Sequence, residues 1–225
     1  MDLPPPPHGR LLSVNLAASP RHTDVKQQST GIGKLPVAHP VQVSAPGPKG
    51  VGGSGLAGDA VCDLRNHGGD DQAVYAYARE DLDWWERELG RELPAGMFGE
   101  NLTTAGLDLT GALVGERWRV GGRTLLQVTS PRIPCEVFAQ KMDEAHWVKR
   151  FTEHGATGAY LRVVEPGPVR AGDPVTIEHR PGHQVTLGLF FRAATREPHL
   201  LGELLAAGDA LPQETRDYIA RRTRV

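Results

Sequence analysis

The sequence predicts a mainly β fold of the α+β class, with a strand-rich body at residues 1–182 and a small C-terminal α-helical domain at residues 183–225. Short apolar segments, several of which alternate with polar residues, recur along the body as expected for strands. The 27 glycines and 18 prolines suit many short strands joined by tight turns better than a helical bundle. Beyond residue 182 the composition becomes helical, which indicates a separate appendage.

The body contains a series of short segments that we interpret as strands. The predicted strands are residues 11–16, 41–43, 61–64, 73–77, 118–120, 125–129, 160–164 and 175–178. Gly121-Gly122 separates two of these segments and predicts a hairpin. Residues 46–55 are rich in glycine and proline, so we expect either a mobile loop or a hairpin tip there.

Amphipathic patterns predict helices in both parts of the chain. Leu82, Trp85 and Leu89 share one face of a helix at residues 80–89, and Gly90 follows as its C-terminal cap. A second helix is predicted at about residues 144–154, before a glycine. The helices predicted for the appendage are residues 185–195, 200–207 and 213–222.

Charge and cysteine content exclude several classes of protein. The formal net charge of −2 argues against a broad nucleic-acid surface, which needs clustered Lys and Arg. The N-terminus does not resemble a signal peptide, and no apolar stretch reaches the roughly 18 residues of a membrane span, so we expect a cytoplasmic protein. Cys62 and Cys135 are too few for a disulfide framework or a cysteine-only zinc site, and we expect both to be reduced thiols.

Cys135 is the first candidate for chemistry. Pro131 and Pro134 flank Arg132-Ile133, so the residues before this cysteine form a rigid, non-helical turn that presents its thiol. Arg132 can stabilise a thiolate, the form that attacks electrophiles and binds soft metals. The alternative is a buried, inert cysteine.

Three further positions can serve an anion or a cofactor. His67 precedes Gly68-Gly69, whose backbone N–H groups can cradle an anion; the alternative is a polar turn with a solvent-facing histidine. Asn101 offers both a donor and an acceptor, although an ordinary capped turn explains it equally well. Lys34 follows Gly31-Ile32-Gly33 without the full spacing of a P-loop, so a surface charge is its alternative.

Five motifs, taken in order, resemble the MOSC domain family and most closely its bacterial YiiM-type branch. The motifs are Gly31-Ile32-x-Lys34, Gly55-Leu56-x-Gly58-Asp59, His67-Gly68-Gly69-x-x-x-Ala73, Phe98-Gly99-Glu100-Asn101-Leu102 and Pro131-Arg132-x-Pro134-Cys135. The tail from about residue 185 is similar to the three-helix appendage of the same branch. The resemblance covers nearly the whole chain apart from the first few residues and residues 46–55, and the order of the motifs makes it specific.

This resemblance implies a MOSC-type β-barrel with peripheral helices that binds the molybdenum cofactor, a molybdenum-molybdopterin, with Cys135 as the metal ligand. A thiolate is a soft donor that suits molybdenum. The residues implied to be catalytic are Cys135, Lys34, His67 and Asn101. The residues implied to bind the cofactor are Lys34, Arg65, His67, Gly68, Gly69, Asn101 and Arg132. Cys62 matches no motif of the family and receives no role.

The implied activity is the reduction of small N-hydroxylated compounds, of the hydroxylaminopurine or amidoxime type. Electrons are expected from a separate flavoprotein or iron–sulfur reductase, and the chain is expected as a monomer or homodimer that binds neither nucleic acid, membrane nor pyridoxal phosphate. One alternative is a cofactor carrier or sulfur-transfer module without turnover. Another is a barrel with a structural cysteine, whose helical tail mediates assembly.

Overall fold

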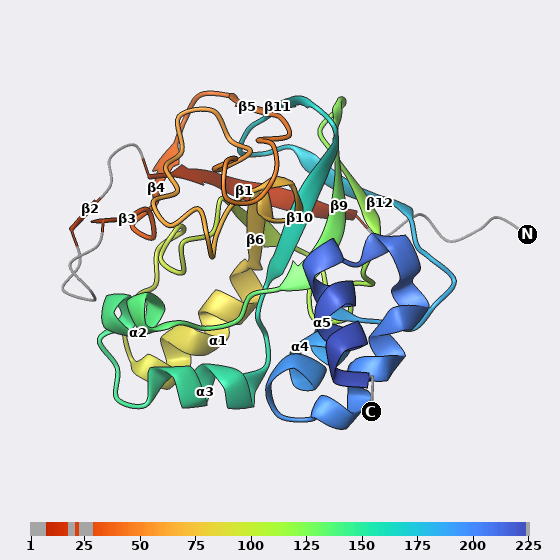
Figure 1. The fold of residues 1–225 in the computed structure, drawn as a ribbon. Helices are drawn as coiled ribbons and strands as arrows, with labels where there is room; N and C mark the ends of the chain where they lie inside the picture. The colour runs from red at the N-terminus through yellow and green to blue at the C-terminus, as the bar shows by residue number, and fades with distance from the viewer. Residues whose placement is uncertain (1–7, 18–20, 23–28, 224–225) are drawn as a thin grey trace, which may run out of the picture.

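The body of the protein is a closed β-barrel with helices on one side (Figure 1). This computed structural model describes residues 8–17, 21–22 and 29–223. Within that part of the chain the barrel strands, in the order in which they pair, are β1 (His8–Leu16), β12 (Pro174–His179), β8 (Arg117–Val120), β9 (Thr124–Pro131), β10 (Ala159–Glu165), β6 (Val74–Ala78) and β7 (Leu102–Ala105). β7 returns to β1, and β4 (Leu35–Val37) extends the sheet beside β1. The predicted α+β barrel is confirmed.

β1 closes the barrel because it pairs with strands on both of its sides. His8 lies opposite Thr176 of β12, whereas Val14 lies opposite Leu102 of β7. The register between β1 and β7 shifts between Leu11 and Ser13. A bulge of this kind bends the strand locally. β6 and β7 run parallel, and the other barrel pairs are antiparallel.

Helices α1 (Arg79–Leu89), α2 (Glu136–Met142) and α3 (Trp147–His154) lie together below the barrel in Figure 1. The aromatic residues that join them are Trp85, Phe98, Phe138, Trp147 and Phe151. The helix predicted at residues 80–89 is confirmed, with Gly90 in a left-handed cap. The sequence does not predict α2. The helix expected from residue 144 begins at Trp147, because His146 before it adopts a left-handed backbone conformation.

The C-terminal segment is helical, as predicted, and packs on the barrel. Its elements are α4 (Leu187–Thr195), η3 (Pro198–Ala210) and α5 (Gln213–Thr223), with a kink in η3 at Gly208. Phe190 and Leu204 belong to the same buried cluster as Trp118 of the barrel. The division into two domains at residue 182 stays a prediction. Among the described helices, none combines the length and the apolar character that crossing a bilayer would require.

The prediction of a strand at residues 61–64 is wrong. The Asp63 carboxylate accepts hydrogen bonds from the backbone N–H of Arg65 at 3.2 Å and from Nδ2 of Asn66 at 2.8 Å. The Asp63 carbonyl oxygen accepts a further hydrogen bond from the N–H of His67 at 2.9 Å. The backbone therefore turns, because a short acidic side chain competes with strand pairing for these donors.

Residues 46–55 form a hairpin tip, which was one of the two expectations for this segment. β5 (Val41–Val43) leads into the tip, and Val43 forms a β-bridge with Leu56 on its far side. The N–H of Gly47 donates to Oδ1 of Asp70 at 2.9 Å, which anchors the tip to η2 (Asp70–Gln72). Two small sheets complete the fold: β5 with β11 (Gly167–Val169), and β2 (Arg21–His22) with β3 (Ser29–Thr30).

Candidate functional site

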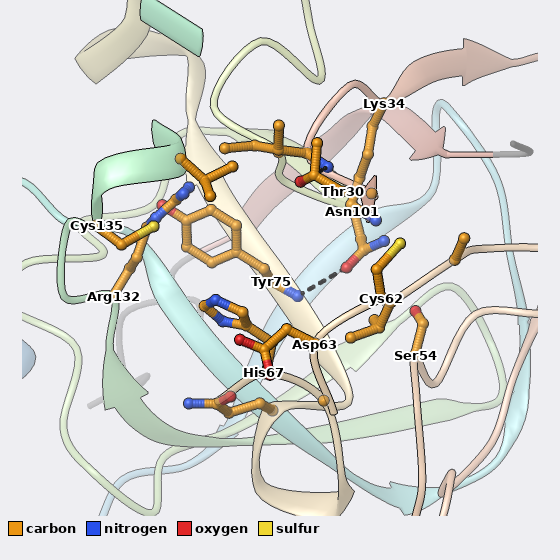
Figure 2. Close-up of a pocket in the computed structure, with 18 of the residues that line it drawn as sticks. Thr30, Lys34, Ser54, Cys62, Asp63, His67, Tyr75, Asn101, Arg132 and Cys135 are labelled. Carbon is orange, nitrogen blue, oxygen red and sulfur yellow. Dashed lines mark hydrogen bonds between the residues drawn. The ribbon is translucent and has the colours of Figure 1, made fainter. Parts of the chain in front are cut away.

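A cavity of about 130 Å³ lies between the start of α2, strands β6 and β10, and the loops that precede β4 and β6 (Figure 2). Its lining brings together the predicted site residues Lys34, His67, Gly68, Asn101, Arg132 and Cys135. Arg65 and Gly69, which were also predicted to bind the cofactor, do not line this cavity. Arg65 is exposed to solvent. Residues from motifs that lie far apart along the chain therefore meet at one cavity.

Cys135 lies at the junction between β9 and α2. It is the N-cap of α2 with an extended backbone, φ −130°, and its partly buried thiol lines the cavity. Burial raises the pKa of Cys135, but hydrogen bonding to His67 and the charge of Arg132 outweigh this effect and lower the pKa to about 7. The thiolate is therefore populated at neutral pH. This is the environment of a reactive cysteine and not of an inert one.

Arg132 places a buried positive charge beside this thiol. The residue is only 6% exposed, and its Nη1 donates a hydrogen bond to the carbonyl oxygen of Phe98. Its Cζ lies 3.9 Å from the ring centroid of Phe138 and 5.2 Å from that of Tyr75, within the range of cation–π contacts. None of the ion pairs formed by the described residues includes Arg132, and the acidic side chains that act on its charge are Tyr75, Tyr160 and the Cys135 thiol.

The two glycines after His67 have different neighbours. Both have positive φ, 80° for Gly68 and 78° for Gly69, which favours glycine at each position. A Cβ on Gly68 would lie 2.7 Å from the carbonyl oxygen of Gly53, and one on Gly69 would lie 2.7 Å from Cα of Lys49. Both glycines thus let the hairpin tip pack against this turn. Of the two, Gly68 also lines the cavity.

Lys34 and Asn101 meet at a residue that the sequence does not predict to be in the site, Asp59. Nζ of Lys34 lies 2.5 Å from each carboxylate oxygen of Asp59, and Nδ2 of Asn101 donates to Oδ2 at 2.8 Å. Asn101 also accepts a hydrogen bond from the N–H of Tyr75 at 3.1 Å and donates to the carbonyl oxygen of Asn15 at 3.4 Å. The amide of Asn101 is therefore engaged by the protein, and Lys34 is buried rather than a surface charge.

Cys62, Tyr75 and Tyr160 also line the cavity, and sequence reasoning does not identify them. The two tyrosines belong to strands whose apolar pattern predicts burial, and their ring centroids are 5.0 Å apart. Cys62 lies across the cavity from Cys135 in Figure 2. Burial raises the pKa of Cys62, partly offset by Lys34. In the sequence, the only signal that connects Cys62 with the site is that it lies five residues before His67.

The donor set restricts how this site can hold a metal ion. Within the described residues no group of three or more His, Cys, Asp or Glu side chains is arranged to bind a metal. A metal held by Cys135 would therefore need most of its ligands from a bound cofactor. The cavity itself is smaller than the roughly 300–1,000 Å³ of typical cofactor sites, so a large cofactor would extend beyond it.

Residues 63–176 match the MOSC domain family. YflK of Bacillus subtilis is 37% identical over 163 residues, which cover 72% of this chain and 70% of that protein. A protein of Gibberella moniliformis named "Reductase" is 29% identical over 138 residues, 60% of this chain but 24% of that protein. The crystal structure of YiiM from Geobacillus stearothermophilus superposes with a TM-score of 0.75 at 28% identity, covering 95% of this chain and 98% of that one.

Proposed function

The chain belongs to the MOSC domain family and is of the YiiM type, and from this premise we propose that it is a molybdenum-cofactor-dependent reductase of N-hydroxylated compounds. The observation that carries the proposal is the position of Cys135. Its thiol lines the cavity between His67 and Arg132, in surroundings that favour the thiolate. A thiolate is the ligand type that a soft metal site requires.

The residues of the cavity fit such a cofactor in their chemistry. Cys135 provides one soft ligand, and the absence of a protein metal cluster in the described residues suits a metal whose other ligands belong to the cofactor. The buried guanidinium of Arg132 has no carboxylate partner there and complements an anionic group. Gly68 adds backbone without a side chain to the cavity wall.

The proposed reaction converts R–NHOH, two electrons and two protons into R–NH₂ and water. The bound cofactor would supply the two-electron redox chemistry. Cys135 would hold the metal, and His67 and Lys34, which line the same cavity, would deliver protons to the leaving oxygen. We assign the electron supply to a separate flavoprotein or iron–sulfur reductase and the location to the cytoplasm. A segment related to this chain makes up 24% of the Gibberella protein that bears the name "Reductase", which supports an association of such a segment with redox chemistry.

Metal content and turnover together test this proposal. The full chain would be produced in cells that make the cofactor, and molybdenum would be measured per protein chain. We expect Cys135→Ala to lower the molybdenum content by about tenfold or more. Cys62→Ala is the matched control, because it removes the other thiol of the same cavity. Undiminished molybdenum in Cys135→Ala would refute the ligand assignment.

Turnover is then measured with benzamidoxime and reduced methyl viologen as the electron donor. The reductase proposal expects one amine product for every two electrons consumed. Stable cofactor binding without turnover would favour the alternative, a cofactor carrier or sulfur-transfer module. Protein that purifies without metal or pterin from cofactor-competent cells would favour a structural role for Cys135.

A further inference from the structure

We propose that Asp59 is a positioning residue that holds the Lys34 ammonium and the Asn101 amide in place and directs one N–H of Lys34 into the cavity. The inference deepens the proposed function, because it concerns a proton donor of the same cavity. It rests on the contacts of Asp59 rather than on any feature of a cofactor. The side chain of Asp59 is 1% exposed.

Both carboxylate oxygens of Asp59 are fully used. Oδ1 accepts from the backbone N–H of Ala17 at 2.8 Å and from Nζ of Lys34 at 2.5 Å. Oδ2 accepts from Nζ of Lys34 at 2.5 Å and from Nδ2 of Asn101 at 2.8 Å. One carboxylate thus connects the residue that follows β1, the loop before β4 and the loop before β7. Two of the residues it fixes are ones that the sequence independently places in the site.

The two contacts with Asp59 neutralise the charge of Lys34 and also fix the direction of its ammonium group. An ammonium group carries three N–H donors, and the Asp59 oxygens are its only recorded acceptors among the described residues. Two donors that point to one carboxylate leave the third for the cavity, which Lys34 lines. Without Asp59 the ammonium would lose the two hydrogen bonds that fix this direction.

Charge explains why the carboxylate is needed. Burial lowers the pKa of Lys34, and Asp59 is the main group that opposes this effect, with smaller contributions from Glu100 and Cys62. Glu100 is itself buried and accepts hydrogen bonds from the backbone N–H groups of Gly96 and Phe98. Removal of Asp59 would leave a buried cation without its closest partner, which destabilises the charged form.

The test follows the protonation of Lys34 in metal-free protein. The chain contains few lysines, so the Cε–Hε signals of isotopically labelled protein can be titrated individually by NMR, with Lys34→Met to assign the Lys34 signal. We expect Asp59→Asn to raise the ratio of neutral to charged Lys34 at a given pH by about tenfold or more. Lys49 is the internal reference, because its partner Glu214 is exposed.

Two outcomes would overturn the inference. The first is an unchanged Lys34 titration in Asp59→Asn. The second applies if Asp59→Asn is too unstable to titrate: the double variant Asp59→Asn/Lys34→Met removes both charges and should recover thermal stability. No recovery would mean that Asp59 acts only by joining the segments around Ala17, Lys34 and Asn101. Because neither measurement uses molybdenum or turnover, the proposed function can fail while this inference holds, and the reverse is also possible.

Discussion

Two thiols line the same cavity in different electrostatic environments. Cys135 interacts with His67 and Arg132, which lower its pKa to about 7 against the effect of burial. Burial raises the pKa of Cys62, and the Lys34 beside it is already paired with Asp59. At the scale of single residues, local charge therefore decides which thiol can act as an anion, and neither the spacing nor the number of cysteines reveals it.

This contrast predicts a difference in alkylation by iodoacetamide in metal-free protein. The thiolate is the reacting form, so the rate at Cys135 should rise through a midpoint near pH 7, whereas the midpoint for Cys62 should lie above the ordinary pKa of a thiol. Peptide mass spectrometry distinguishes the two sites, and each Cys→Ala variant isolates the other thiol. The same midpoint for both cysteines would contradict the assignment.

At the scale of elements, the sequence predicts helices and strands where periodicity is long enough to be read. Leu82, Trp85 and Leu89 identify α1, whereas α2 has seven residues and follows a proline-rich turn, so its pattern is too short to detect. Residues 61–64 look apolar enough for a strand, but the hydrogen bonds of Asp63 turn the backbone there. Contacts between distant segments, such as Asp59 with Lys34, leave no periodic signal at all.

The first turn of α1 contains a carboxyl whose titration should be visible in stability. Burial raises the pKa of Asp81 to about 6, helped by Glu80 and Asp108. A raised folded-state pKa means that stability is complete below the unfolded value near 4 and falls as pH rises through about 6. Asp81→Asn should therefore raise the free energy of unfolding at pH 8 by about 2 kcal/mol, a value reduced for partial exposure, and change it little near pH 3.5.

Denaturant unfolding at several pH values measures this effect. Asp83→Asn is the matched control on the same helix, because Asp83 is half exposed and pairs with Arg79. That change should cost up to about 1 kcal/mol at neutral pH. A gain at pH 8 from Asp83→Asn, or none from Asp81→Asn, would show that burial does not control the ionisation of Asp81.

At the scale of the whole molecule, ordered motifs predict the barrel and most of the cavity, but the relation between the barrel and the tail depends on packing. Val114 donates to the carbonyl oxygen of Val185 at 3.0 Å, and Leu187 donates to that of Ala112 at 2.9 Å. These hydrogen bonds attach the start of the tail to the loop before β8. Buried side chains of α4 and η3 then continue the apolar core of the barrel. We therefore expect the barrel and the tail to unfold together.

Neighbouring leucines of η3 test this expectation. Leu204 is fully buried and Leu205 is 48% exposed, so Leu204→Ala should cost about 3 kcal/mol and Leu205→Ala no more than about 0.5 kcal/mol. All four tryptophans lie in the body, so their fluorescence follows the unfolding of that part, with Trp118 also in the cluster that the tail shares. In a single cooperative unit, Leu204→Ala lowers the denaturation midpoint seen by fluorescence as much as the midpoint seen by far-UV circular dichroism. If the tail were an independent domain, the fluorescence midpoint would stay at the wild-type value while part of the helical signal was lost earlier.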